Sequence, residues 1–179
     1  KCDWSSDVCS SDLSAVSAVN VPSAQEDWRR WLTHLLLQMR EALIECPGAA
    51  QWLLMNGVAT QRSRELMEAG LASLIDAGFG EEAAQAYTVA FTSTTTLIAM
   101  NDARRIPSGQ PSPDHSAMLE RLSNDGPSDP RSSMETLIGK IAGPPDAAEA
   151  TRAEHYRYTL DRVLDGLEAR LNAIKESQK

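Results

Sequence analysis

The feature that most constrains this chain is a long run without a charge, from Ala83 to Asn101. It follows residues 77–80 (AGFG), whose two glycines mark a break between helices, and Glu81 and Glu82, which suit a first helical turn. Nearly half of this run is Gln, Thr, Ser or Asn, which is too polar for a membrane span. A helix uncharged on all sides is buried on all sides. We therefore expect it to face its own core on one side and its copy in a second subunit on the other.

Composition indicates an all-helical protein. The 179 residues are enough for one domain with a real core. The 25 acidic residues outnumber the 17 basic ones, for a net charge of −8, which argues against direct nucleic-acid binding because phosphate contacts need a clustered basic face. Strand formers are scarce, with two Phe and three Tyr, whereas Ala, Leu, Glu and Arg dominate. We predict an all-α fold of five to six helices without a sheet.

Residues 1–24 are predicted to be a non-native leader and linker without order. The run 3–13, DWSSDVCSSDL, resembles the in-frame translation of a common sequencing adapter and is excluded from the fold. Residues 14–24 are a small-residue linker, and the native protein is expected to continue upstream. With Cys2 and Cys9 excluded, only Cys46 remains, so no disulfide is available, which suits a cytoplasmic location.

Residues 25–176 are predicted to form one helical domain. Apolar spacing and breaker residues predict a helix from Ser23 or Gln25 to Pro47-Gly48 and a short one over 49–56. A helix capped by Thr60 runs to the 77–80 break, and the uncharged helix ends near Arg104-Arg105. The remaining predicted elements are a loop over 107–130 with a short helix near 116–122, a short helix over 132–143 and a last helix from Asp146.

This order of elements resembles the C-terminal ligand-binding and dimerisation domain of the TetR family of transcriptional regulators. The similar segments are DWRRWL, MREALIECPGAA, LASLIDAGFGEEAAQAY and LDRVLDGLEARL. The resemblance runs from Trp28 to Asn172, about 80 percent of the chain. The helix-turn-helix of that family has no counterpart in this sequence, where the linker and the adapter-like leader stand in its place.

The resemblance implies a fragment of a repressor. A small, mostly apolar effector would bind inside the helical domain and change the spacing of two DNA-reading heads, so DNA is contacted only through the missing N-terminal domain. It also implies a homodimer formed by a four-helix bundle of the uncharged helix and the last helix of each subunit. The tetracycline-binding branch grips a metal-bound drug through a histidine and other polar groups at positions that carry Leu54 and Asn101 here, and it has another histidine where Thr92-Ser93 stand, which speaks against tetracycline and a magnesium site.

The candidate effector-binding residues project from four helices toward one internal centre. Met and Trp suit an adaptable apolar pocket, and threonine adds hydrogen bonds, although plain core packing is the alternative for each residue. The set is Leu35, Met39, Trp52, Met55, Met67, Leu71, Thr88 and Thr92. We expect the nearby Thr94-Thr95-Thr96 run to bond its hydroxyls to the preceding helical turn rather than to a ligand.

The candidate dimer interface is the apolar seam of the last helix together with one side of the uncharged helix. We expect these side chains to be largely exposed in an isolated subunit, as an interface would be. The set is Phe91, Thr95, Ile98, Leu160, Val163, Leu164, Leu167 and Leu171.

No catalytic constellation is visible, so we expect no enzyme, no metal and no cofactor. His34, His115 and His155 are far apart, and none follows a glutamate three residues earlier, the spacing of di-metal bundle sites. Two alternatives to the regulator remain: a free-standing helical dimerisation or adaptor protein, and, less favoured, a helical-bundle enzyme. Clean genomic sequence upstream of residue 14 would discriminate, because a helix-turn-helix there supports the regulator.

Overall fold

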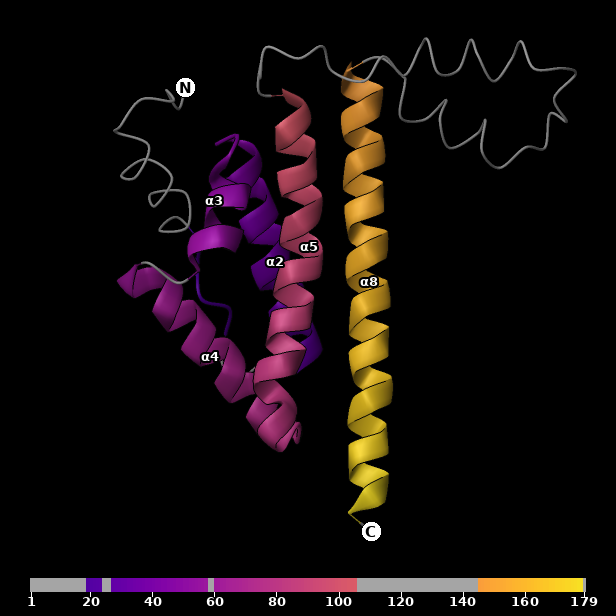
Figure 1. Ribbon diagram of the computed structural model, residues 1–179. Coiled ribbons are helices and arrows are strands. Elements are labelled where there is room, and N and C mark those ends of the chain that lie inside the picture. Colours follow the sequence, from indigo (N-terminus) through magenta and orange to yellow (C-terminus); the bar gives the residue numbers. More distant parts are fainter. Residues whose placement is uncertain (1–18, 24–26, 58–59, 106–144, 179) are drawn as a thin grey trace, which may run out of the picture. The chain divides into compact units, whose positions relative to one another are not determined.

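The computed structural model describes residues 19–23, 27–57, 60–105 and 145–178, and every regular element among them is helical (Figure 1). The predicted all-α class is therefore confirmed for the described chain. Five α-helices are present there, labelled α2 to α5 and α8, with a short 3-10 helix, η1, before α5. The loop predicted over 107–130 and the short helices predicted near 116–122 and 132–143 lie outside the described residues.

The first described helix, α2, spans Trp28–Ile44. It begins later than predicted because the side chain of Asp27 caps it, accepting hydrogen bonds from the backbone N–H groups of Arg29 and Arg30 at 3.1 Å each. One side of α2 is buried in steps of three and four residues, as an amphipathic helix requires. Those buried residues are Trp31, Leu32, Leu35, Leu36, Met39 and Leu43.

Short turns at the predicted breakers separate the next helices. Gly48, with φ of 97°, leads into α3 at Ala49–Asn56. A reciprocal cap opens α4 at Gln61–Ala77: Thr60 Oγ1 accepts the Ser63 N–H and Ser63 Oγ accepts the Thr60 N–H, both at 3.0 Å. Gly78 ends α4 with φ of 107°, a left-handed conformation that other residues rarely adopt.

The uncharged helix predicted from the sequence is α5, Ala83–Arg105, entered through η1 at Gly80–Glu82. It packs against α2, α3 and α4, and so lies at the centre of the helical body (Figure 1). Its core-facing side carries mostly small residues, which let the neighbouring helices approach closely. These are Ala83, Ala86, Ala90, Thr94 and Ile98, all buried.

The last helix, α8, spans Pro145–Ser177 and is shared between two compact units. One unit comprises residues 1–106 and 159–179, and in it the part of α8 from Thr159 onward runs antiparallel to α5 (Figure 1). The other unit comprises residues 107–158, of which only the helical part 145–158 is described. That part carries an ion pair between Arg152 and Glu149, one helical turn apart, at 2.9 Å.

Residues 19–23 differ from the disordered linker predicted before residue 24. Val19 is 2% exposed and Pro22 is buried, so this segment packs against the helical body. The Val19 carbonyl accepts two hydrogen bonds from Arg62 of α4, and the Asn20 N–H donates one to Gln38 of α2. The prediction is wrong for these residues because two buried side chains, Val19 and Pro22, and three hydrogen bonds anchor them. Residues 1–18 and 24–26 lie outside the described chain.

Candidate functional site

An aromatic junction joins α2, α4 and α5. Gly70 lies on α4 where a side chain would collide with two rings: a Cβ there would be 2.5 Å from Tyr87 Cε2 and 2.9 Å from Trp31 Cζ3. The glycine therefore makes room for Tyr87 against α4. Tyr87 also stacks on Phe91, one turn further along α5, with ring centroids 6.2 Å apart and planes at 9°. Trp31 and Tyr87 thus flank Gly70, and Phe91 extends this aromatic cluster along α5.

The Tyr87 hydroxyl is the unusual polar group of this junction. Burial raises the pKa of Tyr87 to about 12, because the charged phenolate loses its solvation there. The residue as a whole is only half-buried, whereas the hydroxyl lies in dense surroundings. No group in the described chain forms a hydrogen bond with it. A phenol in such a place favours a partner that brings a hydrogen-bond acceptor.

The eight predicted effector-binding residues do not share one internal centre. Leu35 and Met39 are buried in the core, whereas Trp52, Met67 and Leu71 are half-buried. Met67 lies on α4 three residues before Gly70, whereas Leu71 directly follows Gly70 and projects from a different side of the helix. The other three, Met55, Thr88 and Thr92, are exposed, so the expectation of a common centre is wrong for them.

The exposure of these three residues has local causes. Met55 is 79% exposed near the end of α3, just before Gly57 closes that helix. Thr88 and Thr92 lie on the side of α5 opposite Ala83, Ala86 and Ala90, which take the core-facing positions. Their hydroxyls donate to backbone oxygens of their own helix, Thr88 to Ala84 at 2.8 Å and Thr92 to Thr88 at 2.7 Å.

The threonine run that follows behaves as expected at its first position. The Thr94 hydroxyl donates to the backbone oxygen of Ala90 at 2.8 Å, and the residue is fully buried. This bond satisfies a polar group inside the core, so the expected bond back to the preceding helical turn is confirmed for Thr94.

The predicted dimer seam is buried inside the subunit. Six of the eight side chains in the set are buried: Thr95, Ile98, Leu160, Leu164, Leu167 and Leu171. The expectation of a largely exposed seam is therefore wrong, because α8 turns its leucines toward the body formed by its own chain. Val163 and Phe91 are half-buried. Phe91 stacks on Tyr87 and so lies on the α4-facing side of α5, away from the position predicted for it.

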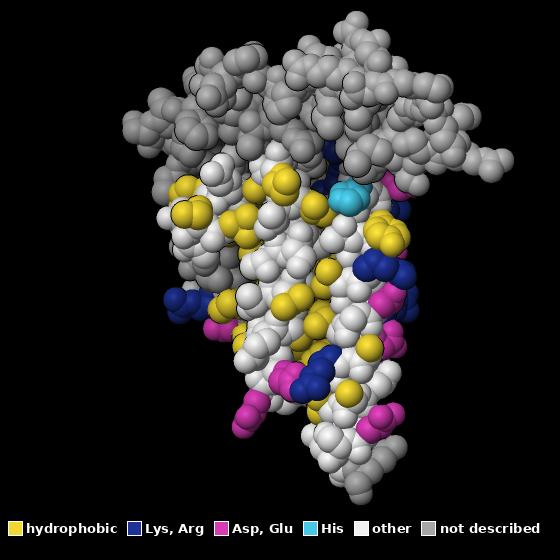
Figure 2. Space-filling view, turned by 45° about the vertical axis from the view of Figure 1, so that its right-hand side comes forward, with side chains coloured by type: hydrophobic (Ala, Val, Ile, Leu, Met, Phe, Trp, Pro, Cys, Tyr) yellow, Lys and Arg dark blue, Asp and Glu magenta, His cyan; other side chains and the backbone are white. Residues whose placement is uncertain are grey.

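The side of α5 that points away from the core-facing residues Ala83, Ala86 and Ala90 is exposed and carries no charge. We call it the outer face of α5. Figure 2 shows a surface over the middle of the helix that is white and yellow, with charged side chains toward its margins. Val89 is 47% exposed and Met100 is 53% exposed. The face consists of Ala84, Gln85, Thr88, Val89, Thr92, Thr96 and Met100.

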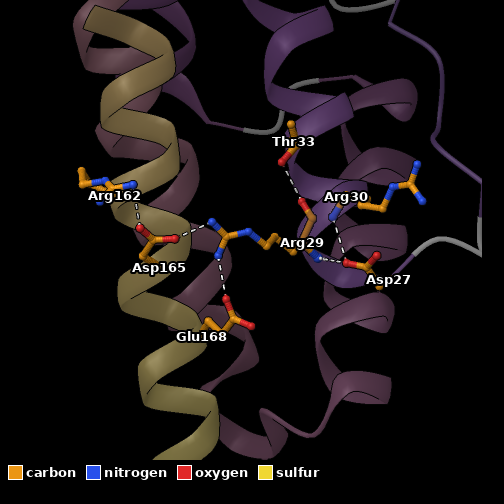
Figure 3. A network of polar contacts seen from close by, with 7 residues as sticks. All are labelled: Asp27, Arg29, Arg30, Thr33, Arg162, Asp165 and Glu168. Atoms are coloured by element: carbon orange, nitrogen blue, oxygen red, sulfur yellow. Dashed lines mark hydrogen bonds and ion pairs between the residues drawn. The ribbon is translucent and has the colours of Figure 1, made fainter.

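Charged contacts fasten α8 beside its leucines. Arg29 of α2 donates to Asp165 and, at 2.9 Å, to Glu168, and Arg162 pairs with Asp165 at 2.8 Å (Figure 3). The hydrogen bond from Arg29 is the main reason that the pKa of Asp165 falls below its ordinary value. Figure 3 shows the Arg29 side chain reaching across from α2, where Asp27 caps the same helix.

A second fastening lies at the start of α5. Arg170 of α8 donates two hydrogen bonds to the carboxylate of Glu82, the last residue of η1. These bonds lower the pKa of Glu82 and raise the pKa of Arg170. Both partners are accessible to solvent, so the bidentate geometry fixes the register of α8 more than it adds stability.

The described residues contain neither a candidate metal-binding group nor a helix able to span a membrane. No group of three or more His, Cys, Asp or Glu side chains in these ranges is arranged to hold a metal ion. None of the described helices combines the length and apolar character needed to cross a bilayer. Comparisons with protein-family models, with curated proteins and with solved structures gave no match.

Proposed function

We propose that this chain is the effector-binding and dimerisation part of a TetR-like transcriptional repressor. DNA would be read by a separate N-terminal domain of the full protein. The observation that carries the proposal is the outer face of α5, which is exposed in the single subunit yet contains no charged residue. Together with the resemblance from Trp28 to Asn172, that face favours a second copy of the chain as its cover.

An uncharged exposed helix face is costly for a protein that stays alone in water. Surfaces of soluble proteins usually carry charges on roughly 25–35% of their residues. From Ala84 to Met100 the outer face of α5 would extend about 25 Å at 1.5 Å per residue. Pairing it with the same face of another subunit removes Val89 and Met100 from water and adds no unpaired charge.

The dimer can be tested by light scattering coupled to size exclusion. The wild-type chain should have twice its monomer mass at micromolar concentration, and Met100→Glu should shift it toward the monomer because the carboxylate would be buried without a partner. Met55→Glu is the matched control, since Met55 is exposed on α3 outside the outer face of α5 and the variant should stay dimeric. A monomeric wild type, or a dimeric Met100→Glu, would contradict the proposal.

The effector site is proposed at the aromatic junction rather than at the centre predicted from the sequence. The half-buried rings of Tyr87 and Phe91 offer flat apolar surfaces, and half-buried Met67 lies on α4 three residues before Gly70. The unbonded Tyr87 hydroxyl would add one polar contact. A flat, mostly apolar molecule with a carbonyl or ether oxygen suits this combination of groups.

A thermal-shift screen of aromatic ketones against the wild-type chain tests the effector site. Compounds that raise the melting temperature should bind about 5- to 10-fold more weakly to Tyr87→Phe, which loses about 1 kcal/mol of hydrogen bonding. Tyr158→Phe is the control, because Tyr158 is 63% exposed. Hits that bind Tyr87→Phe with full affinity would place the site elsewhere. A dimer that binds none of the compounds would favour the adaptor alternative.

A further inference from the structure

A short N-terminal segment ties two helices together. We call residues 19–22 the strap. The Val19 carbonyl accepts hydrogen bonds from Arg62 Nε at 3.2 Å and from Arg62 Nη2 at 2.8 Å, while the Val19 side chain is 2% exposed. One residue on, the Asn20 N–H donates to Gln38 Oε1 at 3.1 Å. The strap therefore contacts the start of α4 and the middle of α2.

Arg62 is held in place for this role. It lies in the first turn of α4, two residues after Thr60, which together with Ser63 fixes where the helix begins. Its third nitrogen, Nη1, pairs with Glu65 one turn later at 3.2 Å. A guanidinium anchored at one end and bonded twice to one carbonyl moves with its helix, because its planar fork leaves little freedom for it to swing.

We propose that the strap transmits movements of the first turn of α4 to the chain that precedes Val19. This proposal rests on the proposed function, because α4 also carries Gly70 at the aromatic junction. A ligand that shifts α4 would pull the Val19 carbonyl through Arg62. The coupling is reciprocal, so loosening the strap must also loosen the first turn of α4.

Hydrogen exchange followed by mass spectrometry on the full chain tests whether Arg62 of α4 holds the strap in place. In Arg62→Ala, the Asn20 amide should exchange about 10-fold faster, since two charge-assisted bonds to the preceding carbonyl are lost. In Arg62→Lys, which offers a single ammonium group, the exchange rate of the Asn20 amide should lie between the rates in the wild type and in Arg62→Ala. Arg64→Ala is the control: Arg64 is exposed on the same helix, and its side chain makes no hydrogen bond or ion pair in the described chain. An unchanged Asn20 rate in Arg62→Ala would overturn the proposal.

Two variants of the strap itself test the reverse effect, which is whether the strap stabilises the start of α4. Val19→Gly removes the buried side chain, and the amides of residues 64–67 should then exchange several-fold faster. Val21→Gly adds the same backbone freedom at a valine that is 38% exposed, and should leave those amides unchanged. Equal rates in the two variants would overturn the coupling. Neither measurement needs an effector, a dimer or DNA, so its failure would be distinct from failure of the proposed function.

Discussion

At the scale of single residues, Gly70 is a helical glycine with no room for a side chain. A glycine inside a helix costs about 0.5–1 kcal/mol relative to alanine, so a buried one needs a packing reason. The reason here is the ring of Tyr87, which occupies the space that a side chain on Gly70 would need. Sequence pattern offered no sign of this, because Gly70 falls within an otherwise regular helical spacing and its partner belongs to a different helix.

Gly70→Ala should lower the free energy of unfolding by about 1–3 kcal/mol, because the added methyl group forces the stacked Tyr87 ring or Trp31 to move. Gly166→Ala is the matched control in α8. Nothing lies within 4 Å of a Cβ at that position, so alanine should raise the free energy of unfolding by about 0.5–1 kcal/mol. Urea denaturation of both variants measures whether each substitution lowers or raises the free energy of unfolding. A stabilised Gly70→Ala would show that the junction is loosely packed.

At the scale of elements, α8 combines a leucine side with charges at its edges. The alternating spacing of Leu160, Leu164, Leu167 and Leu171 correctly predicted a buried side of the helix. Spacing alone says nothing about which surface covers that side, and the seam was wrongly expected to await a second subunit. The ion pairs made by Arg29 and Arg170 were also beyond prediction, because their partners lie 88 to 139 residues away in the sequence.

Leu164→Ala therefore tests stability rather than assembly. Leu164 is fully buried, so truncation should reduce the free energy of unfolding by about 2–5 kcal/mol through lost burial and a residual cavity. Ile75→Ala removes a similar side chain that is 55% exposed on α4, and should cost less than about 1 kcal/mol. Chemical denaturation of the two variants supplies the comparison. A Leu164→Ala chain as stable as Ile75→Ala would restore the exposed-seam interpretation.

The Glu82–Arg170 pair should make the docking of α8 sensitive to acid. The folded pKa of Glu82 lies below its ordinary value, so the pair stabilises the fold above about pH 4 and loses that effect as the pH falls through the lowered pKa. Wild type should melt at a higher temperature than Glu82→Gln at pH 7, and the difference should vanish near pH 3. The neighbouring substitution Glu81→Gln, which leaves the Glu82–Arg170 pair intact, is the control. A difference that persists in acid would mean that the carboxylate acts through packing rather than charge.

At the scale of the whole molecule, sequence reasoning was strongest where single residues dictate the backbone. Gly48, Gly57 and Gly78 were predicted to separate helices and do so with positive φ. The uncharged run was correctly predicted as one helix, yet its two sides were misassigned: Phe91 faces α4, and Thr88 and Thr92 face outward. Small and uncharged residues lie on all sides of this helix, so the sequence does not distinguish an apolar side from a polar one. Which side faces the core therefore depends on packing against the other helices.

Charge distribution over the whole chain leads to the last prediction, which is that this chain alone does not bind duplex DNA. Non-specific affinity comes almost entirely from basic groups that replace condensed counterions, and here the net charge is −8. Five arginines of the described chain are already paired with carboxylates: Arg29, Arg62, Arg152, Arg162 and Arg170.

A gel-shift assay with a duplex of about 30 base pairs should show no retardation at about 100 mM salt, where a basic DNA-binding domain still binds. Lowering the salt should not produce binding either, because the phosphates and the acidic surface repel each other more strongly as screening weakens. Retardation that strengthens steeply at low salt would reveal a basic surface on this chain and would overturn the assignment of DNA reading to a separate domain.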